Sequence, residues 1–167
     1  MSIFPTKILL ATDGSQDAEL AATTAGDLAN KTGSELHIVH VRPITTPHYP
    51  GYYIGPEVVE DAEAKEREHL DRQAQWLLDT QAEKIHAAGG SVTQSHLRFG
   101  KAEEEVVALA EKLGVRLIVL GSRGRGGLRR ALLGSVSDSV VRHAHCPVLV
   151  VRPEKERSVE REANFLT

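Results

Sequence analysis

Cysteine is almost absent from this chain, since Cys146 is the single one among 167 residues. One cysteine excludes an intramolecular disulfide framework and fits a reducing compartment. Long apolar runs are also missing, and none approaches the roughly 20 residues that span a bilayer. Residues 1–7 contain no basic region that leads into an apolar stretch of signal-peptide length. These absences predict a cytoplasmic protein with no membrane partner.

Neither sign of charge dominates, because 20 basic residues stand against 23 acidic ones and the formal net charge is −3. This balance gives no electrostatic basis for binding nucleic acid or an anionic membrane surface. Aromatic residues are scarce, at 4% of the chain, and Trp76 is the single tryptophan. We expect Trp76 to pack the long helix on which it lies. Tyr49, Tyr52 and Tyr53 fall in a proline-rich segment that we expect to be a surface loop.

What the chain does contain is enough apolar sequence, 41% of its residues, to bury a core without metals or disulfides. We predict one α/β domain over residues 1–152 and a charged tail over 153–167. Short apolar runs alternate with segments of helical periodicity, which predicts a mostly parallel sheet with helices on both faces. Strands are expected at 7–12, 35–41, 91–98, 115–120 and 147–152, and helices between Ser15 and Gly33, over 57–86, over 102–113 and after Gly134.

A glycine- and arginine-rich segment follows the apolar run 115–120. It contains Gly121, Gly124 and Gly134, and the expected last helix begins directly after it. Glycines let a backbone approach a ligand closely, and a helix N-terminus presents unpaired N–H groups. Four arginines in the same segment have no acidic residue among them: Arg123, Arg125, Arg129 and Arg130. The pattern predicts a site for a phosphate-bearing ligand, most simply a nucleotide.

The first expected strand also ends in residues of interest, Asp13-Gly14-Ser15. In parallel sheets, ligands bind beyond the carboxyl ends of the strands, where the strand order reverses. If the first and fourth strands are neighbours, Asp13 and the glycine segment face one crevice. Asp13 could instead simply cap the following helix, because aspartate, serine and glycine are all favoured at that position.

The spacing Gly121-x2-Gly124-x9-Gly134-Ser135 resembles the nucleotide-binding pattern of the universal stress protein family. The resemblance extends over residues 5–152: the segment from Lys7 to Ser15 is similar to the family's opening strand and acidic residue, and residues 136–151 are similar to its closing helix and strand. It implies a five-stranded parallel sheet in the order 3-2-1-4-5, with the first and fourth strands side by side.

The resemblance also implies the ATP-binding branch of the family. Asp13 would then contact the ribose, Val41 would help to hold adenine, and the glycines with Ser135 would bind ribose and phosphates. Mg²⁺ would be held mainly by the phosphates. The candidate binding residues are Thr12, Asp13, Val41, Gly121, Arg123, Gly124, Gly134, Ser135 and Val136.

Two features have plainer interpretations. We expect Ser135 to cap its helix and to donate to phosphate as well. The run His143-Ala-His145-Cys146 contains metal-binding residue types, but no other Cys or His has the spacing of a metal site. We therefore predict no metal ligands in the protein, and we expect Cys146 to be a small buried residue.

The last expected strand, Pro147–Val151, is almost wholly apolar. At a sheet edge it would be an exposed template for pairing, and pairing with its own copy in a homodimer would remove that liability. Family members commonly dimerise through this strand.

The leading prediction is a nucleotide-dependent regulatory protein of the stress response that binds ATP. An alternative is a slow ATPase in which Asp13 orients a water, although the chain has no G-x4-G-K-[ST] loop. A further alternative is an interaction protein that has the fold and no nucleotide.

Overall fold

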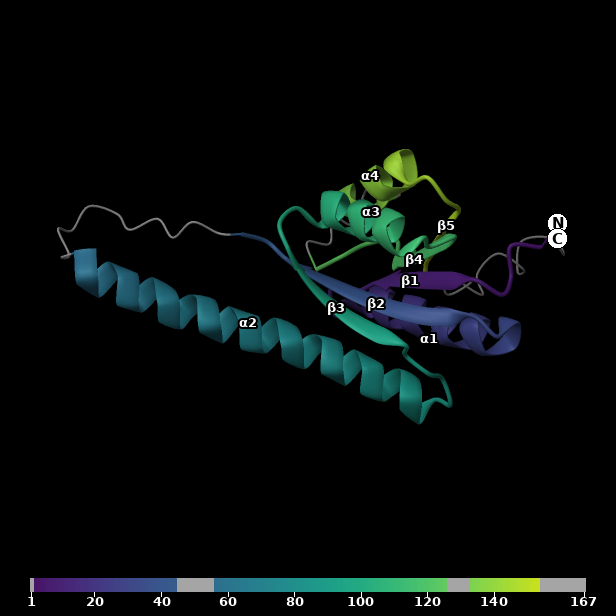
Figure 1. Cartoon of the computed structure of the whole chain (residues 1–167), viewed down its shortest axis with the longest axis horizontal. Helices are drawn as coiled ribbons and strands as arrows, with labels where there is room; N and C mark the ends of the chain where they lie inside the picture. The colour runs from purple at the N-terminus through teal and green to yellow at the C-terminus, as the bar shows by residue number, and fades with distance from the viewer. Residues whose placement is uncertain (1, 45–55, 126–132, 154–167) are drawn as a thin grey trace, which may run out of the picture.

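The computed structural model describes residues 2–44, 56–125 and 133–153. Strands and helices alternate along the chain (Figure 1). Their bounds are β1 Lys7–Ala11, α1 Gln16–Thr32, β2 Glu35–Arg42, α2 Pro56–Ala87, β3 Gln94–Phe99, α3 Ala102–Leu113, β4 Leu117–Gly121, α4 Ser135–His143 and β5 Val148–Val151. The predicted charged tail lies outside the described residues from 154 onward, as do Tyr49, Tyr52 and Tyr53.

All five strands are parallel and lie in the order β3-β2-β1-β4-β5. The predicted fold class and strand order are therefore confirmed. β1 pairs with β4 from Ile8 opposite Leu117 to Ala11 opposite Leu120. Because the chain after β1 turns toward β2 and the chain after β4 continues to β5, the strand order reverses between β1 and β4. The segments that follow these two strands consequently leave the sheet side by side.

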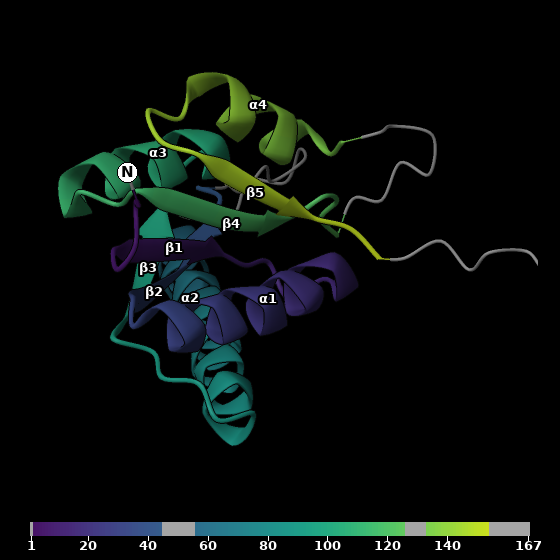
Figure 2. The same cartoon turned by 90° about the vertical axis from the view of Figure 1, so that its right-hand side faces the viewer.

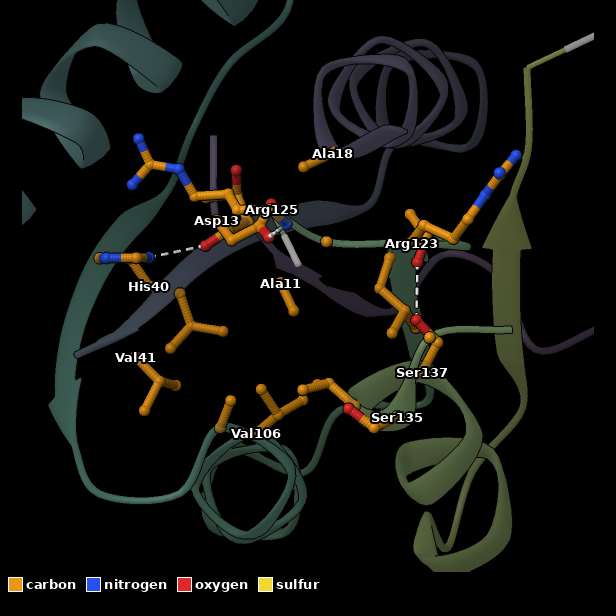
Figure 3. Close-up of a pocket in the computed structure, with 18 of the residues that line it drawn as sticks. Ala11, Asp13, Ala18, His40, Val41, Val106, Arg123, Arg125, Ser135 and Ser137 are labelled. Atoms are coloured by element: carbon orange, nitrogen blue, oxygen red, sulfur yellow. Dashed lines mark hydrogen bonds between the residues drawn. The ribbon is translucent and has the colours of Figure 1, made fainter. Parts of the chain in front are cut away.

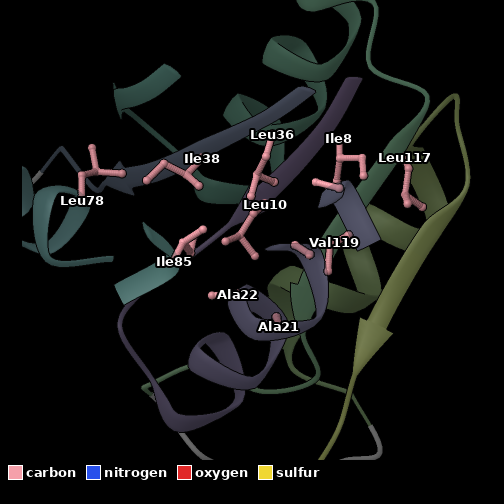
Figure 4. Packing of buried hydrophobic residues seen from close by; sticks show 12 residues of the cluster. Ile8, Leu10, Ala21, Ala22, Leu36, Ile38, Leu78, Ile85, Leu117 and Val119 are labelled. Carbon is pink, nitrogen blue, oxygen red and sulfur yellow. The ribbon is translucent and has the colours of Figure 1, made fainter. Parts of the chain in front are cut away.

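Two layers of helices cover the sheet, with α1 and α2 on one face and α3 and α4 on the other (Figure 2). The strands are buried on both faces, so consecutive apolar residues of a strand pack into different cores, one on each side of the sheet. Ile8 and Leu10 pack against α1 and α2, as Figure 4 shows, whereas Leu9 packs toward α3 and α4. Their complete burial explains why β1 reads as a continuous apolar run and not as an alternating one.

Local signals set the ends of the helices. The Ser15 hydroxyl caps α1 by accepting a hydrogen bond from the Ala18 N–H at 3.2 Å. Gly33 ends the same helix in the left-handed conformation, with φ of 64°, which glycine adopts without steric cost. Gly114 ends α3 in the same way. The helix ends predicted at these two glycines are confirmed.

The buried apolar residues among residues 60–87 of the long helix α2 lie in its second half, and they are Ala74, Leu78 and Ile85. Its first half extends past the sheet (Figure 1). Trp76 is 70% exposed, so the prediction that it packs this helix was wrong. The physical reason is the helical period: Trp76 is two residues from both Ala74 and Leu78, which places it on the opposite side of the helix.

None of the helices in the described parts of the chain combines the length and the apolar character that crossing a membrane requires.

Candidate functional site

A cavity of about 440 Å³ opens beyond the carboxyl ends of the strands, between the segments that follow β1 and β4. All of the residues predicted to bind nucleotide line it, from Thr12 and Asp13 through Val41 to the glycines, Arg123, Ser135 and Val136. These residues are up to 124 positions apart in sequence, from 12 to 136. The pairing of β1 with β4 is what brings them together.

One side of the cavity is apolar. Ala11, Val41 and Val106 lie there, on β1, β2 and α3 (Figure 3). Val39 and Leu120 also line the cavity. Such a wall suits a flat, weakly polar group such as a nucleobase.

The other side of the cavity is formed by the N-terminus of α4, where Ser135 and Ser137 lie (Figure 3). Gly134 occupies the N-cap position and no side chain caps the helix, so the expectation that Ser135 caps it was wrong. Ser135 is instead the first helical residue. The N–H groups of residues 135–137 have no carbonyl partner within the helix, because the first turn of an α-helix leaves its donors unpaired. This end of the cavity can therefore receive an anion.

Asp13 does not cap α1, because Ser15 takes that role. Its Oδ1 accepts from the Ser15 N–H at 2.9 Å, which shapes the turn after β1. Its Oδ2 accepts from the Arg125 N–H at 2.9 Å, which joins this turn to the glycine segment. The alternative of Asp13 as a helix cap was therefore wrong, and its carboxylate connects the two loops that border the cavity.

The charged groups of Arg123 and Arg125 do not point into the cavity, although their positive charge predicted contact with a phosphate. The backbone of Arg125 is bound to Asp13, and the side chains of Arg123 and Arg125 extend away from the centre of the cavity in Figure 3. The Arg123 Nε atom is 3.8 Å from Oδ2 of Asp17. Arg129 and Arg130 lie outside the described residues.

Two of the three glycines, Gly121 and Gly124, stand where the structure leaves no room for a side chain. A Cβ atom at Gly121 would lie 2.6 Å from the carbonyl carbon of Asp17, and one at Gly124 would lie 2.5 Å from Oδ2 of Asp13. A Cβ at Gly134 would meet the Arg123 Cα atom at 3.4 Å. The first two contacts are shorter than any real Cβ contact. Gly121 and Gly124 thus have a packing cause, which is the close approach of residues 121–124 to α1 and Asp13.

Three residues that shape the cavity were not predicted from the sequence: Asp17, Ser137 and His40. Asp17 accepts from the Ser122 hydroxyl at 2.7 Å and from the Arg123 N–H at 3.1 Å. The Ser137 hydroxyl donates to the Gly121 carbonyl at 2.8 Å. His40 Nδ1 is 2.8 Å from the Thr12 carbonyl, and since a carbonyl only accepts, this nitrogen carries the proton.

No local signal marks these three contacts. An aspartate in the first turn of a helix, such as Asp17, is ordinarily explained by the helix dipole. Their partners lie 28, 16 and 105 or more positions away along the chain. Only the strand order could have pointed to them.

The segment around Cys146 has no arrangement typical of a metal centre. The His143 Nδ1 atom is 2.8 Å from the Ser139 carbonyl, and the His145 Nε2 atom is 2.7 Å from Glu111. Burial raises the pKa of the Cys146 thiol, although a backbone hydrogen bond from Ile118 acts in the opposite direction. Within residues 2–44, 56–125 and 133–153, no three His, Cys, Asp or Glu side chains are placed to hold a metal ion.

Comparison with known proteins identifies what the chain is related to. A Staphylococcus haemolyticus protein, SH1215, assigned to the universal stress proteins, is 37% identical over 149 residues, which is 89% of this chain and 85% of that protein. The solved structure of the protein MJ0577 superposes with a TM-score of 0.74 at 28% identity, covering 92% of this chain and 99% of that one.

Two other solved universal stress proteins contain nucleotides, one cAMP and one, from Archaeoglobus fulgidus, dAMP. Each is 22% identical and covers 90% of this chain and 99% of its own, with TM-scores of 0.62 and 0.56. At that identity the likeness shows the fold alone. The profile of the universal stress protein family, however, matches residues 5–152. Together with the strand order and the SH1215 relative, this match shows that the chain belongs to the universal stress protein family.

Proposed function

We propose that the protein binds an adenine nucleotide, ATP in the first instance, and acts as a nucleotide-dependent regulatory protein in the cytoplasm. The observation that carries this proposal is the composition of the cavity. An apolar wall of three elements lies opposite the N-terminus of α4 within one space of about 440 Å³. That volume is within the range of small-molecule sites.

In this proposal the base lies against Val41 and Val106, and one phosphate accepts hydrogen bonds from the N–H groups of Ser135 and Val136. Asp13, at the mouth between them, contacts the ribose. Mg²⁺ is held mainly by the phosphates. The single cysteine supports the cytoplasmic location, because it fits a reducing compartment.

Both sides of the cavity are needed energetically. Charge-assisted hydrogen bonds contribute about 1.5–3 kcal/mol each, so three of them supply no more than about 10 kcal/mol. Association itself costs about 4–15 kcal/mol. Phosphate contacts alone therefore leave little net affinity, and burial of the base against the apolar wall has to supply the remainder.

The first experiment is to denature the purified protein and identify any released nucleotide by mass spectrometry. The stripped protein is then titrated calorimetrically with Mg·ATP, ADP and cAMP. We expect co-purified nucleotide or micromolar binding of ATP. No nucleotide and no heat would contradict the proposal and favour the alternative of an interaction protein that has lost the ligand.

Gly124→Val tests the site itself. A Cβ at this position would lie 2.5 Å from the Asp13 carboxylate, so the substitution should displace Asp13 and distort the glycine segment. We expect ATP affinity to fall at least about tenfold, which is about 1.4 kcal/mol. Gly26→Ala is the control, because Gly26 does not line the cavity and its added Cβ would meet the Ile85 side chain at an ordinary 3.4 Å. Unchanged affinity in folded Gly124→Val would refute the assignment.

Turnover of ATP is the alternative, and the absence of a G-x4-G-K-[ST] loop from the sequence counts against it. Both carboxylate oxygens of Asp13 already accept backbone N–H groups, from Ser15 and Arg125. Each oxygen keeps a second lone pair, so Asp13 can contact the ribose or orient a water without giving up either bond. Steady-state phosphate release that Asp13→Ala abolishes would establish the enzymatic alternative in place of binding alone.

A further inference from the structure

Asp17 is a buried carboxylate on the first turn of α1, 9% exposed, in contact with the glycine segment. One of its oxygens, Oδ2, accepts two hydrogen bonds: from the Ser122 hydroxyl at 2.7 Å and from the Arg123 N–H at 3.1 Å. Ser122 is fully buried, so its hydroxyl cannot exchange this hydrogen bond for one to solvent. These two bonds attach the residues directly after β4 to α1.

Ser122 also connects to the N-terminus of α4. Its carbonyl accepts from the Gly134 N–H at 2.7 Å, and Gly134 is the N-cap residue of α4. A continuous path of hydrogen bonds therefore runs from the Asp17 carboxylate through Ser122 to the helix N-terminus that borders the cavity. Displacing Ser122 would move that N-terminus relative to the apolar wall.

Two carboxylates hold the backbone of residues 123–125. Asp17 accepts the N–H of Arg123, and Asp13 accepts the N–H of Arg125. These two N–H groups are engaged within the protein, whereas the first turn of α4 presents N–H groups that have no partner within the helix. Residues 122–125 are thus held in place beside the helix end that can receive an anion.

A carboxylate near a phosphate site ordinarily repels the ligand. Here the Arg123 guanidinium offsets the charge of Asp17, since its Nε is 3.8 Å from the oxygen that makes both hydrogen bonds. The arrangement uses the acceptor capacity of Asp17 while limiting its electrostatic cost.

We propose that Asp17 is a positioning residue of the nucleotide site: it touches no ligand, and it sets the N-terminus of α4 at the distance from the apolar wall that a nucleotide requires. This inference rests on the proposed function. The feature that matters is the acceptor oxygen and not the negative charge.

The test compares Mg·ATP affinity by calorimetry among wild type, Asp17→Ala and Asp17→Asn. Asn keeps an acceptor oxygen for Ser122 and Arg123, whereas Ala removes it. We expect Asp17→Ala to bind at least about tenfold more weakly and Asp17→Asn to stay within about threefold of wild type. Asp27→Ala is the control, because Asp27 is an exposed acid on the same helix whose carboxylate lies 2.7 Å from Lys31.

A second measurement needs no nucleotide. The amide resonances of Arg123 and Gly134 in ¹H–¹⁵N NMR spectra should shift in Asp17→Ala and return toward wild type in Asp17→Asn. A Gly134 resonance that is unmoved in Asp17→Ala would overturn the path from Asp17 to α4.

The outcomes separate the two proposals. If wild type binds no nucleotide, the proposed function fails and the inference fails with it. If wild type binds ATP and Asp17→Ala binds it equally well, only the inference is overturned. Equal losses in Asp17→Ala and Asp17→Asn would also overturn it, because the acceptor oxygen would then not be the relevant feature.

Discussion

At the scale of single residues, the close approach of backbone segments shapes the cavity more than the charges of the side chains do. The conspicuous arginines at 123 and 125 extend away from the cavity centre, while the small residues beside them permit the contacts that build it (Figure 3). Gly121 is the clearest case, because the backbone of α1 at Asp17 and Ala18 passes directly against it. The acidic residues are the ones that make the connecting hydrogen bonds.

Gly121→Ala should destabilise the protein by about 1–3 kcal/mol, as overpacking in a well-packed interior does. The added Cβ would meet the carbonyl carbon of Asp17 at 2.6 Å and the Ala18 nitrogen at 2.8 Å, and backbone atoms cannot rotate aside. Urea denaturation measures the free energy of unfolding. Gly26→Ala, in the middle of α1, should be neutral or stabilising by up to about 1 kcal/mol. Equal effects of the two substitutions would contradict this explanation.

At the scale of elements, the helices and strands differ in how firmly packing holds them. β1 and β4 are buried on both faces, whereas the buried apolar residues among residues 60–87 of α2 lie in its second half. Arg42 at the end of β2 binds Asp71 of α2 at 2.8 Å, near the place where the buried part of the helix begins. Substitutions along α2 should therefore have very unequal effects.

Leu78→Ala should cost about 2–5 kcal/mol of stability, because Leu78 is 1% exposed and belongs to the core between α2 and the sheet. Trp76→Ala, two residues away on the solvent side, should change stability by about 0.5 kcal/mol or less. Thermal unfolding followed by circular dichroism compares the two. A large loss in Trp76→Ala would show that the exposed face of α2 is covered in solution.

The pairing of β2 with β3 should depend on pH. The ring of His96 stacks on that of the buried His37, with Nε2 and Nδ1 3.1 Å apart. The pKa of His96 is lowered, first by burial and then by the charges of His37, Arg98 and Lys112, while Glu35 lies 3.5 Å from the far side of His37. The folded state thus binds fewer protons at His96 than the unfolded chain does.

The stability that neutral His96 contributes is fully present above the histidine pKa of the unfolded chain, about 6.5. It is lost as the pH falls below that value. Urea denaturation at pH 7.5, 6.5 and 5.5 should show the free energy of unfolding decreasing. His96→Gln removes the titrating group and should make this decrease smaller. An identical pH dependence in the variant would exclude His96 as its source.

At the scale of the whole molecule, the sheet leaves β5 at one edge. Within the described chain its partner is β4 alone, and Leu149 at its middle is 37% exposed. An apolar edge strand invites pairing with another chain. We propose that two copies pair through Val148–Val151 in a two-fold dimer.

Leu149→Lys should convert the proposed dimer into a monomer, because a two-fold axis would bring two added charges into one interface. Sedimentation velocity measures the change, and an unaltered thermal unfolding midpoint at low concentration would show that the fold is intact. A wild-type protein that sediments as a monomer would refute the dimer itself.

Much of the molecule follows from local sequence. Apolar runs, helical periodicity, Ser15 and the glycines at 33 and 114 act between residues a few positions apart, so the helices and strands and their order along the chain could be predicted. The same periodicity, applied to Trp76, would have placed it on the solvent side of α2. The family resemblance, and not any local pattern, supplied the strand order.

The remaining features arise only where distant segments meet. Asp17 and Ser122 are 105 positions apart, and Asp13 and Arg125 are 112 apart, yet these contacts connect the two loops at the cavity. Short-range propensities determined the elements because their energies depend on neighbours in sequence. Tertiary structure alone decided which carboxylate meets which N–H group, because the parallel pairing of β1 with β4 fixes those distances.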